Sequence, residues 1–424
     1  MQIKELLRGI PACTCGKAHL CPIENVVIGK DALSALSDVT KEYKHILLVA
    51  DENTYRAAGE RAVLYLGRRL ENALVFPGDR VVIPNEKAIA AIEAHLTENT
   101  DLIVGVGSGV INDLCKIVSF KHGLRYDIVA TAPSMDGYAS VGSALILDGM
   151  KVTLNAAVPR SIIADTAVLA NAPVEMIRAG YGDIIGKYSC LNDWRLAALV
   201  LDEYICSTVW EATMEEVEKT VRLADGIRAC NEEAIGALME ALVGVGILMA
   251  YVGNSRPASG SEHHLSHYFE IIGIERNEEY LPHGIDVCFS AIETARLREA
   301  LVALPSLDGY THVFDQSKYE AEIRRIYGSV ADEVLALQKK LGWYERDRVG
   351  IYREKWAEIR KLLTEAPTAD EMFSLAERVG LDKQAFYGLY SKEKIADALL
   401  YAKDLKDRYS VLWMYYDLFG QKQL

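Results

Sequence analysis

Histidine is the residue type whose spacing in this sequence most directly indicates chemistry. The chain has nine histidines, and four of them lie within residues 262–284. His263 and His267 are four residues apart, so they would share one face of a helix, whereas His264 would point about 100° away from His263. His283 adds a third imidazole twenty residues after His263. Imidazoles gathered in this way favour a site for a divalent transition metal.

A carboxylate ligand is expected beside these histidines, because imidazoles alone would leave the site strongly cationic. Asp183, in the motif GYGDIIGK, is the candidate, since an unpaired aspartate in an otherwise apolar helical stretch would be costly to bury. The alternative is that Asp183 caps a helix near Gly182.

A glycine-rich turn follows an apolar run in the motif GVGSGVIND, which contains Gly105, Gly107, Ser108, Gly109 and Asp113. Glycines allow the backbone to approach a pyrophosphate closely, and the amide groups and dipole of a following helix stabilise its charge. The alternative is that the glycines serve only close packing. The order of strand, glycine turn and helix start predicts a dinucleotide site.

Asp51 and Asn53 end the first strong strand, where an acidic side chain can accept hydrogen bonds from the adenosine ribose. This position predicts NAD(H) as the cofactor, with NADP(H) as the alternative. The competing interpretation is that the segment Asp51-Glu-Asn53 caps the next helix.

The elements that must position these residues change in character along the chain. A length of 424 residues predicts two domains. Up to about Asp165, apolar β-rich runs alternate with helical ones, which predicts an α/β domain with a Rossmann-like parallel sheet and crossover helices over residues 1–165. The expected strands are His45–Ala50, Leu74–Phe76, Asp101–Val106 and Asp127–Ala132, and Asn85 is expected to cap a helix that runs through Leu96.

Residues 166–424 show helical periodicity without a further strand pattern, which predicts an all-helical second domain. The segment Thr368-Ala-Asp-Glu371 has the spacing of a capping box and should start a helix directly after Pro367. We expect the active site in a cleft between the two domains.

The composition excludes some partners. A formal net charge of −14 makes nucleic acid and anionic lipid unfavourable partners. The most apolar stretch, Ala241–Gly253, is shorter than the roughly 20 residues of a membrane span, and Met1–Ala12 contains no apolar run of signal-peptide length. We therefore expect a cytoplasmic protein without membrane insertion.

The eight cysteines divide into two groups. Cys13, Cys15 and Cys21 lie with His19 in one short segment, which could hold a zinc ion but lacks the Cys-x-x-Cys spacing of structural sites, so a surface loop is the favoured interpretation. The other cysteines stand alone among apolar neighbours and are expected to be core thiols: Cys115, Cys190, Cys206, Cys230 and Cys288.

Six motifs between roughly Asn25 and Ser290 resemble the sn-glycerol-1-phosphate dehydrogenases: GVGSGVINDLCK, TAPSMDGYAS, NAAVPRSIIADT, GYGDIIGKYS, SGSEHHLSH and LPHG. This family belongs to the superfamily of iron-containing alcohol dehydrogenases, glycerol dehydrogenase and dehydroquinate synthase. The resemblance implies one divalent metal per chain, held by Asp183, His263 and His283. Lys187 stands where the iron-type enzymes place a histidine, which favours zinc or nickel over iron.

The resemblance also implies a reaction of phospholipid metabolism, the reversible reduction of dihydroxyacetone phosphate to sn-glycerol 1-phosphate with NAD(P)H. The metal would act as Lewis acid and His267 as proton relay. Asp136 would touch the substrate hydroxyls, although Asp136-Gly137 could simply form a turn. Thr131 and Ser134, in the TAPSMDGYAS motif, would contact the cofactor.

A phosphorylated three-carbon substrate needs cations near the metal. Lys151 and Arg256 are the candidates, Lys187 is an additional catalytic candidate, and Arg160 is expected to lie in solvent. A structural ion pair is the alternative role of Arg256. Competing functions are a glycerol dehydrogenase for unphosphorylated polyol, a lyase like dehydroquinate synthase, and a nucleotide sensor without activity. We expect a homo-oligomer, such as a homodimer.

Overall fold

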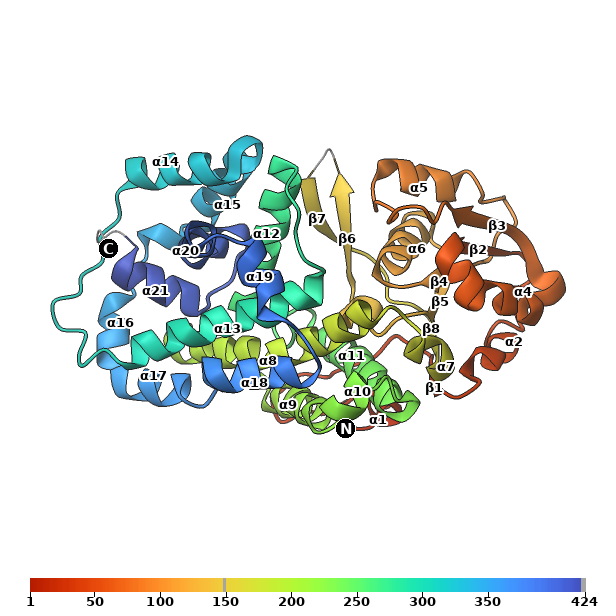
Figure 1. Cartoon of the computed structure of the whole chain (residues 1–424), viewed down its shortest axis with the longest axis horizontal. Coiled ribbons are helices and arrows are strands. Elements are labelled where there is room, and N and C mark those ends of the chain that lie inside the picture. Colours follow the sequence, from red (N-terminus) through yellow and green to blue (C-terminus); the bar gives the residue numbers. More distant parts are fainter. Residues whose placement is uncertain (148–149, 421–424) are drawn as a thin grey trace. The chain divides into compact units, whose positions relative to one another are not determined.

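The computed structural model describes residues 1–147 and 150–420 of the chain. By their internal contacts these residues form two compact units, the first within residues 1–184 and 211–255 and the second within residues 185–210 and from residue 256 onward. The expected boundary after residue 165 follows the end of the last strand. The first unit of the structure also includes residues 211–255, whose helices pack with the α/β elements of the N-terminal part. Figure 1 shows these α/β elements in red to yellow.

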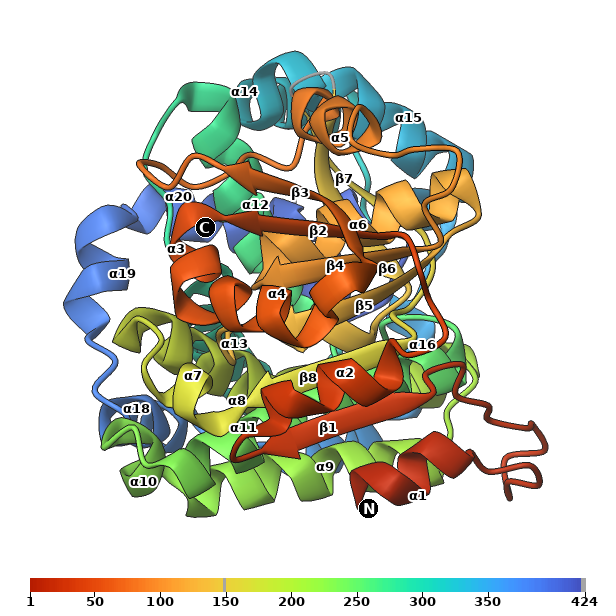
Figure 2. The ribbon, with the colours of Figure 1, turned by 90° about the vertical axis from the view of Figure 1, so that its right-hand side faces the viewer.

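A parallel sheet forms the centre of the first unit, as predicted, and Figure 2 shows it from one side. It has six strands, and β1 and β8 were not among the four strands expected from the sequence. Its central strands are buried along almost their whole length, which explains their continuous apolar runs. In spatial order the strands are β1 (Asn25–Gly29), β8 (Ser161–Asp165), β5 (Arg125–Ala130), β4 (Leu102–Gly107), β2 (Ile46–Asp51) and β3 (Leu70–Phe76).

The strand order reverses between β2 and β4. From β2 the chain adds β3 on one side, whereas β4, β5 and β8 follow on the other side. Ala50 pairs with Val106, and Gly107 pairs with Ala130, so the carboxyl ends of β2, β4 and β5 lie next to one another. Open α/β sheets bind ligands at such a reversal, outside the carboxyl ends of the strands.

Nine helices of the described residues lie wholly in the first unit. They are α1 (Ile3–Arg8), α2 (Leu36–Val39), α3 (Glu52–Thr54), α4 (Glu60–Leu66), α5 (Glu86–Glu93), α6 (Gly109–His122), α7 (Thr166–Ala170), α10 (Ala224–Arg228) and α11 (Glu232–Val252). Two further helices, α8 (Val174–Leu201) and α9 (Ser207–Arg222), contribute residues to both units.

Helix α11 begins nine residues before the apolar stretch Ala241–Gly253 that the sequence singled out. Its 21 residues would by length and composition suffice to cross a membrane, but 78% of its most apolar window is buried inside the structure. The helix packs against α7 and against the 3-10 turn η4 (Asp136–Ala139). Its apolar composition is therefore that of a core helix.

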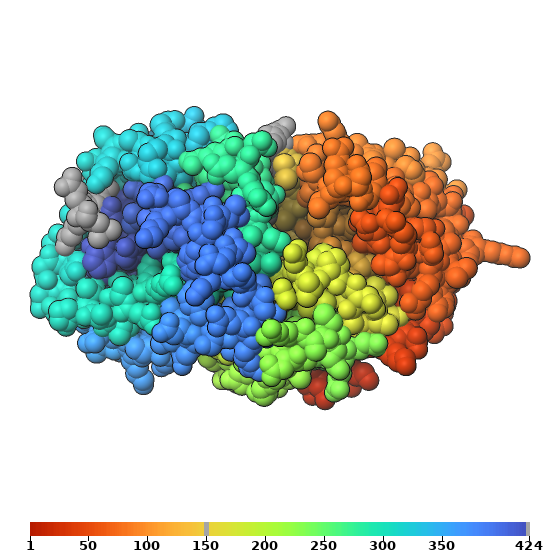
Figure 3. Space-filling model, viewed as in Figure 1, coloured from red at the N-terminus to blue at the C-terminus, as the bar shows by residue number. Residues whose placement is uncertain are grey.

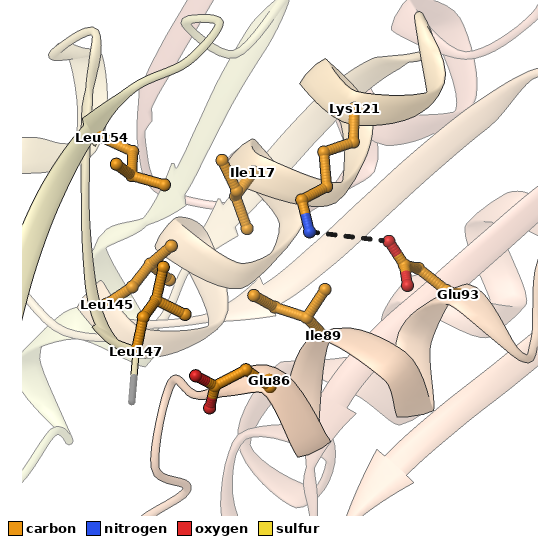
Figure 4. Close-up of a pocket in the computed structure, with 8 residues that line it drawn as sticks. All are labelled: Glu86, Ile89, Glu93, Ile117, Lys121, Leu145, Leu147 and Leu154. Atoms are coloured by element: carbon orange, nitrogen blue, oxygen red, sulfur yellow. Dashed lines mark ion pairs between the residues drawn. The ribbon is translucent and has the colours of Figure 1, made fainter. Parts of the chain in front are cut away.

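The antiparallel hairpin of β6 (Gly142–Leu147) and β7 (Met150–Asn155) was not predicted. It lies outside the parallel sheet and is fixed to α6, because the Ser143 hydroxyl donates to the carbonyl of Asp113 at 2.9 Å. Side chains of α5, α6 and the hairpin line a pocket of about 390 Å³ (Figure 4). Lys121 and Glu93 form an ion pair of 3.9 Å beside it, and its lining contains no candidate site residue.

The second unit is built from helices, in agreement with the predicted helical C-terminal region. After α8 and α9 it contains α12 (Ser261–Arg276), α13 (His283–Val302), α14 (Gln316–Tyr327), α15 (Ala331–Leu341), α16 (Val349–Glu354), α17 (Trp356–Leu363), α18 (Ala369–Arg378), α19 (Lys383–Leu389), α20 (Lys392–Tyr401) and α21 (Val411–Phe419). The face of this unit drawn in Figure 3 is formed largely by the segments coloured teal to blue, so the long C-terminal part belongs to the same compact body.

Two predicted helix starts are confirmed by their caps. Thr368 and Glu371 form the expected capping box, with the Glu371 amide donating to the Thr368 hydroxyl at 3.3 Å, and α18 begins at Ala369. Asn85 caps α5 by accepting from the Ala88 amide at 3.1 Å. Helix α5 ends at Glu93, three residues before the predicted end at Leu96.

Candidate active site

Three imidazoles gather on α12 and at the start of α13. His263 and His267 lie one turn apart on α12, and His283 is the first residue of α13. The ring centroids of His263 and His283 are 5.1 Å apart, those of His267 and His283 are 5.6 Å apart, and those of His263 and His267 are 6.0 Å apart. The spacing read from the sequence therefore corresponds to a real cluster.

Asp183 joins two of these histidines. Asp183, His263 and His283 each offer one ligand atom, and these atoms all lie within 4.8 Å of one another. Asp183 is fully buried in the interior of α8, so it does not cap a helix. The division between the two units falls inside α8 directly after Ile184, so Asp183 lies on the same continuous helix as Lys187.

Glu262 holds the ring of His263, a role that the sequence analysis missed. Oε1 of Glu262 lies 2.7 Å from Nδ1 of His263 and also accepts from the Gly260 amide at 2.9 Å. A carboxylate on one imidazole nitrogen leaves the other nitrogen as the ligand, which is the usual second contact of a metal-binding histidine. The position of Glu262 directly before His263 was the signal available in the sequence.

A buried polar network ties the helices of the site together. Asp193 on α8 accepts from the amide of Ser261 at 2.7 Å and from the amide of Val411 at 2.8 Å, so it binds the N-terminal ends of α12 and α21. Ser189, also on α8, lies 3.1 Å from the Ser261 hydroxyl and 2.9 Å from the Thr294 hydroxyl of α13. These contacts fix the positions from which the ligands project.

Lys187 is fully buried one turn after Asp183. Burial raises the pKa of Glu262, and the amide of Gly260 and the positive charge of Lys187 oppose that shift. The lysine therefore acts electrostatically on the carboxylate that holds His263. His264, next to His263, is also buried but lies outside the ligand cluster, and burial lowers its pKa well below 6.5.

Asp136 contacts the site through its backbone, because its amide donates to Oδ2 of Asp183 at 3.0 Å. The η4 turn that contains Asp136 is supported by Lys116, which the sequence analysis did not single out. The buried Lys116 ammonium donates to the carbonyls of Gly142 at 2.7 Å and Gly137 at 3.1 Å. It lies 3.4 Å from Asp113, which opposes the lowering of the Lys116 pKa by burial.

The glycine turn lies at the strand-order reversal, where β4 ends and α6 begins. A Cβ on Gly107 would lie 2.5 Å from Cβ of Ile111, and one on Gly105 would lie 2.9 Å from Sγ of Cys115. Close packing of α6 on β4 thus requires these glycines. Ser108 is the N-cap residue of α6 and makes no side-chain cap hydrogen bond.

Thr131 and Ser134 follow β5, so the predicted cofactor residues of this segment lie at the same edge of the sheet. The Thr131 amide donates to the carbonyl of Gly107 at 3.1 Å. Asp113 binds the hairpin, because its Oδ2 accepts from the Ala144 amide at 3.2 Å. This contact gives Asp113 a scaffold role, while its contact with the cofactor stays a prediction.

Asp51 and Asn53 lie at the carboxyl end of β2, as expected. Oδ1 of Asp51 accepts from the amides of Asn53 at 2.8 Å and Thr54 at 3.0 Å, so the capping alternative describes a real contact. The Asn53 side chain donates to the carbonyl of Gly78 at 3.0 Å. Ribose binding by these residues stays a prediction.

The candidate cations have different surroundings. Arg256 is 3% exposed, forms a two-pronged ion pair with Glu203 that includes a contact of 2.6 Å, and donates to the carbonyl of Tyr409 at 2.8 Å. This ion pair is the structural alternative that the sequence left open, and phosphate binding by Arg256 stays a prediction. Lys151 lies in β7, and its side chain is outside the described part of the structure.

The expectation that Arg160 lies in solvent was wrong. Arg160 is 7% exposed and forms an ion pair with the fully buried Asp127, and its guanidinium lies 4.9 Å from the centre of the Tyr43 ring. Burial raises the pKa of Asp127 to about 6, against the opposing charge of Arg160. The arginine is buried because it neutralises a carboxylate at the centre of the sheet.

The fold and the ligand cluster together define the class. Residues 27–173 match the family of iron-containing alcohol dehydrogenases. An iron-containing alcohol dehydrogenase from Thermococcus thioreducens has a TM-score of 0.60 at 16% identity and covers 94% of this chain and 99% of its own. A maleylacetate reductase from Agrobacterium tumefaciens has a TM-score of 0.60 at 13% identity and covers 96% and 99%. The chain therefore has the iron-containing alcohol dehydrogenase fold.

Relatives of higher sequence identity indicate one family within this class. A glycerol-1-phosphate dehydrogenase, NAD(P)+, from Halalkalibacterium halodurans is 35% identical over 297 residues, which are 68% of this chain and 74% of the relative. One from Geobacillus thermodenitrificans is 30% identical over 396 residues, which are 91% and 88%. The chain belongs to the glycerol-1-phosphate dehydrogenase family, as the motifs indicated.

Proposed function

We propose that this chain catalyses the reversible, metal-dependent reduction of dihydroxyacetone phosphate to sn-glycerol 1-phosphate with NAD(P)H. The observation that carries the proposal is the cluster of Asp183, His263 and His283 in a chain of this family. Relatives named for this activity cover up to 91% of the chain.

The three side chains fit a divalent metal by their chemistry. They offer one carboxylate oxygen and two imidazole nitrogens, and Glu262 is placed to hold the second nitrogen of His263. Three protein ligands leave a coordination position for substrate. When bound, such a metal supplies Lewis acidity toward the ketone. We propose zinc or nickel, because Lys187 occupies the place of the fourth ligand of the iron-type enzymes.

The nucleotide is proposed to bind at the carboxyl edge of the sheet. Strands β2, β4 and β5 bring Asp51, the turn from Gly105 to Gly109, and Thr131 to neighbouring positions there. Backbone amides at the start of α6 would bind the pyrophosphate, and Asp51 would accept from the ribose.

The remaining site residues position the substrate and move its proton. His267 is half-buried with its ring centroid 5.6 Å from that of His283, and an imidazole titrates near neutral pH, so we assign it the proton transfer. Asp136 is assigned to the substrate hydroxyls. Lys151 and Arg256 are assigned to the phosphate, and Lys187 adds positive charge beside Glu262.

A substrate comparison tests the proposal. Purified protein loaded with zinc or nickel should oxidise NADH or NADPH faster with dihydroxyacetone phosphate than with dihydroxyacetone. A preference for the unphosphorylated ketone would indicate a glycerol dehydrogenase, and turnover without net cofactor oxidation would indicate a lyase. Either result overturns the proposed function. We also propose a cytoplasmic homo-oligomer, whose mass light scattering would measure.

A further inference from the structure

The N-terminal segment from Gly9 to His19 forms a small hairpin that brings two cysteines close to a histidine. Ile10 and His19 pair in an antiparallel bridge, with amide-to-carbonyl distances of 2.7 and 2.9 Å. Between them the Gly16 amide donates to the carbonyl of Cys13 at 3.0 Å, which closes the turn. Gly9 has a φ of +73°, and a Cβ there would lie 2.6 Å from the carbonyl oxygen of His19. The bridge therefore requires glycine at this position.

A fourth side chain, that of Cys206, lies beside the hairpin although it is distant in the sequence. Cys206 directly precedes α9, and the ligand atoms of Cys13, Cys15, His19 and Cys206 all lie within 4.8 Å of one another. From Glu211 onward α9 belongs to the same unit as the hairpin, and the N-terminal amine of Met1 pairs with Glu215 of this helix. Cys206 is thus attached to that unit by a continuous helix.

The ring of His19 is oriented in the manner of a metal ligand. Its Nδ1 lies 2.9 Å from the carbonyl oxygen of Tyr251, and its Nε2 lies 3.3 Å from Sγ of Cys15. The ring is fully buried and stacks on Tyr251 at a centroid distance of 5.5 Å. A backbone carbonyl on one nitrogen fixes the tautomer that presents the other nitrogen to a metal.

We propose that Cys13, Cys15, His19 and Cys206 bind a structural zinc ion, separate from the metal at Asp183. Three sulfur ligands and one imidazole complete a tetrahedral site without an open position, which is the arrangement of structural zinc. Thiolates also exclude magnesium and calcium, which prefer oxygen ligands. With a Zn–S bond of about 2.3 Å, ligand atoms at the corners of a tetrahedron are about 3.8 Å apart, which is inside the observed range.

The proposed ligands come from two segments of the chain, and a third segment orients one of them. The hairpin carries three ligands, α9 follows the fourth, and α11 supplies the carbonyl of Tyr251. Helix α11 also binds α1, because the Tyr251 hydroxyl donates to the carbonyl of Leu6. A metal that binds only the folded arrangement stabilises the docking of this segment.

Metal analysis of full-length protein tests the proposal, with an Asp183→Ala variant used to remove the other site. Wild-type protein should contain two metal ions per chain, and the Asp183→Ala variant should retain one zinc. Cobalt substituted into that variant should show thiolate-to-cobalt charge transfer in the near ultraviolet, which an aspartate and histidine site cannot produce. An Asp183→Ala protein without bound metal and without this absorption would overturn the proposal.

Cysteine variants assign the ligands. Cys206→Ser and Cys15→Ser should each lower the zinc content by one ion per chain. The matched control is Cys21→Ser, because Cys21 is half-buried in the same segment but outside the cluster. Equal zinc loss in the control and the ligand variants would refute the assignment. If the ligand variants are insoluble, the cobalt spectrum of the Asp183→Ala protein still decides whether the site exists.

Discussion

Oε1 of Glu262 lies 2.7 Å from Nδ1 of His263, two consecutive residues of α12. Glu262 therefore orients the imidazole, and His263 offers its other nitrogen as the metal ligand. The same oxygen accepts from the Gly260 amide at 2.9 Å, which anchors the carboxylate at the start of the helix. Glu262 is fully buried, so its contact with His263 is not weakened by solvent. Its carboxylate therefore determines which nitrogen of His263 faces Asp183 and His283.

Removal of a ligand should remove the metal of this site. We expect Asp183→Ala, His263→Ala and His283→Ala each to lower the metal content by one ion per chain, because the three side chains form a single cluster. Elemental analysis of the purified variants measures this. His264→Ala is the matched control, since His264 is buried beside His263 but is not in the cluster. Full metal content in the folded ligand variants would show that the assignment is wrong.

Glu262→Ala should weaken metal binding without removing a ligand. Loss of a residue that orients a metal-binding histidine typically costs about 10- to 100-fold in metal affinity. Glu262→Gln keeps an oxygen acceptor for Nδ1 of His263 and should recover part of the affinity. Competition with a chelator measures both dissociation constants. Unchanged affinity in the alanine variant would leave Glu262 with a role in folding only.

The start of α6 should bind the cofactor through its backbone. Gly109 is the residue to change, because a Cβ there would meet only the flexible end of Met135 at 3.2 Å. We expect Gly109→Ala to raise the dissociation constant of NADH at least tenfold, or about 1.4 kcal/mol, at an unchanged melting temperature. Gly350→Ala is the control, since Gly350 is helical and has open space around its Cβ. Equal NADH affinity in both variants would place the pyrophosphate elsewhere.

Arg256→Ala should show whether Arg256 recognises the substrate phosphate or only forms the ion pair with Glu203. A charge-assisted hydrogen bond is worth roughly 1.5–3 kcal/mol, so we expect about a ten- to hundredfold loss of kcat/KM for dihydroxyacetone phosphate. The kcat/KM for unphosphorylated dihydroxyacetone should fall much less. Glu203→Ala removes the ion pair but keeps the cation, so it should preserve the ratio of the two substrates. If both variants lower both activities equally, the role of Arg256 is structural.

Arg160→Ala should destabilise the first unit in a pH-dependent manner. Breaking a buried pair costs about 3–5 kcal/mol when the remaining charge stays buried. The pKa of Asp127 is raised from 3.8 to about 6 in the folded protein, so the stability that this carboxyl contributes in its protonated form is lost as the pH rises through about 6. Without Arg160 this pKa should rise further.

Thermal unfolding at several pH values measures this effect. The variant should be closest to wild type below pH 6, where Asp127 is protonated, and furthest from it at pH 8. Arg125→Ala is the control, because Arg125 pairs with Glu24 in an exposed position and should matter by about 1 kcal/mol at most. A destabilisation that does not change with pH would show that Asp127 is not the group responsible.

Local patterns in the sequence determined the parallel sheet, the glycine turn and the histidine cluster. Buried strands of a parallel sheet require continuous apolar runs, and a helix places residues four apart on one face, so His263 and His267 are related by spacing alone. The capping box at Thr368 is local in the same sense, because its hydrogen bonds join residues three apart. The β6–β7 hairpin could not be predicted from such patterns, because it is a single pair of short strands outside the sheet.

Only the tertiary structure decided which distant side chains meet. Cys206 has the sequence surroundings of a core thiol, yet it lies with Cys13, Cys15 and His19, whereas the nearby Cys21 does not. Arg160 is buried because Asp127, on a neighbouring strand, needs a counter-charge. The periodicity of the sequence indicates whether a position is buried. The partner of a buried polar group depends instead on how whole elements pack, which residues along the entire chain determine together.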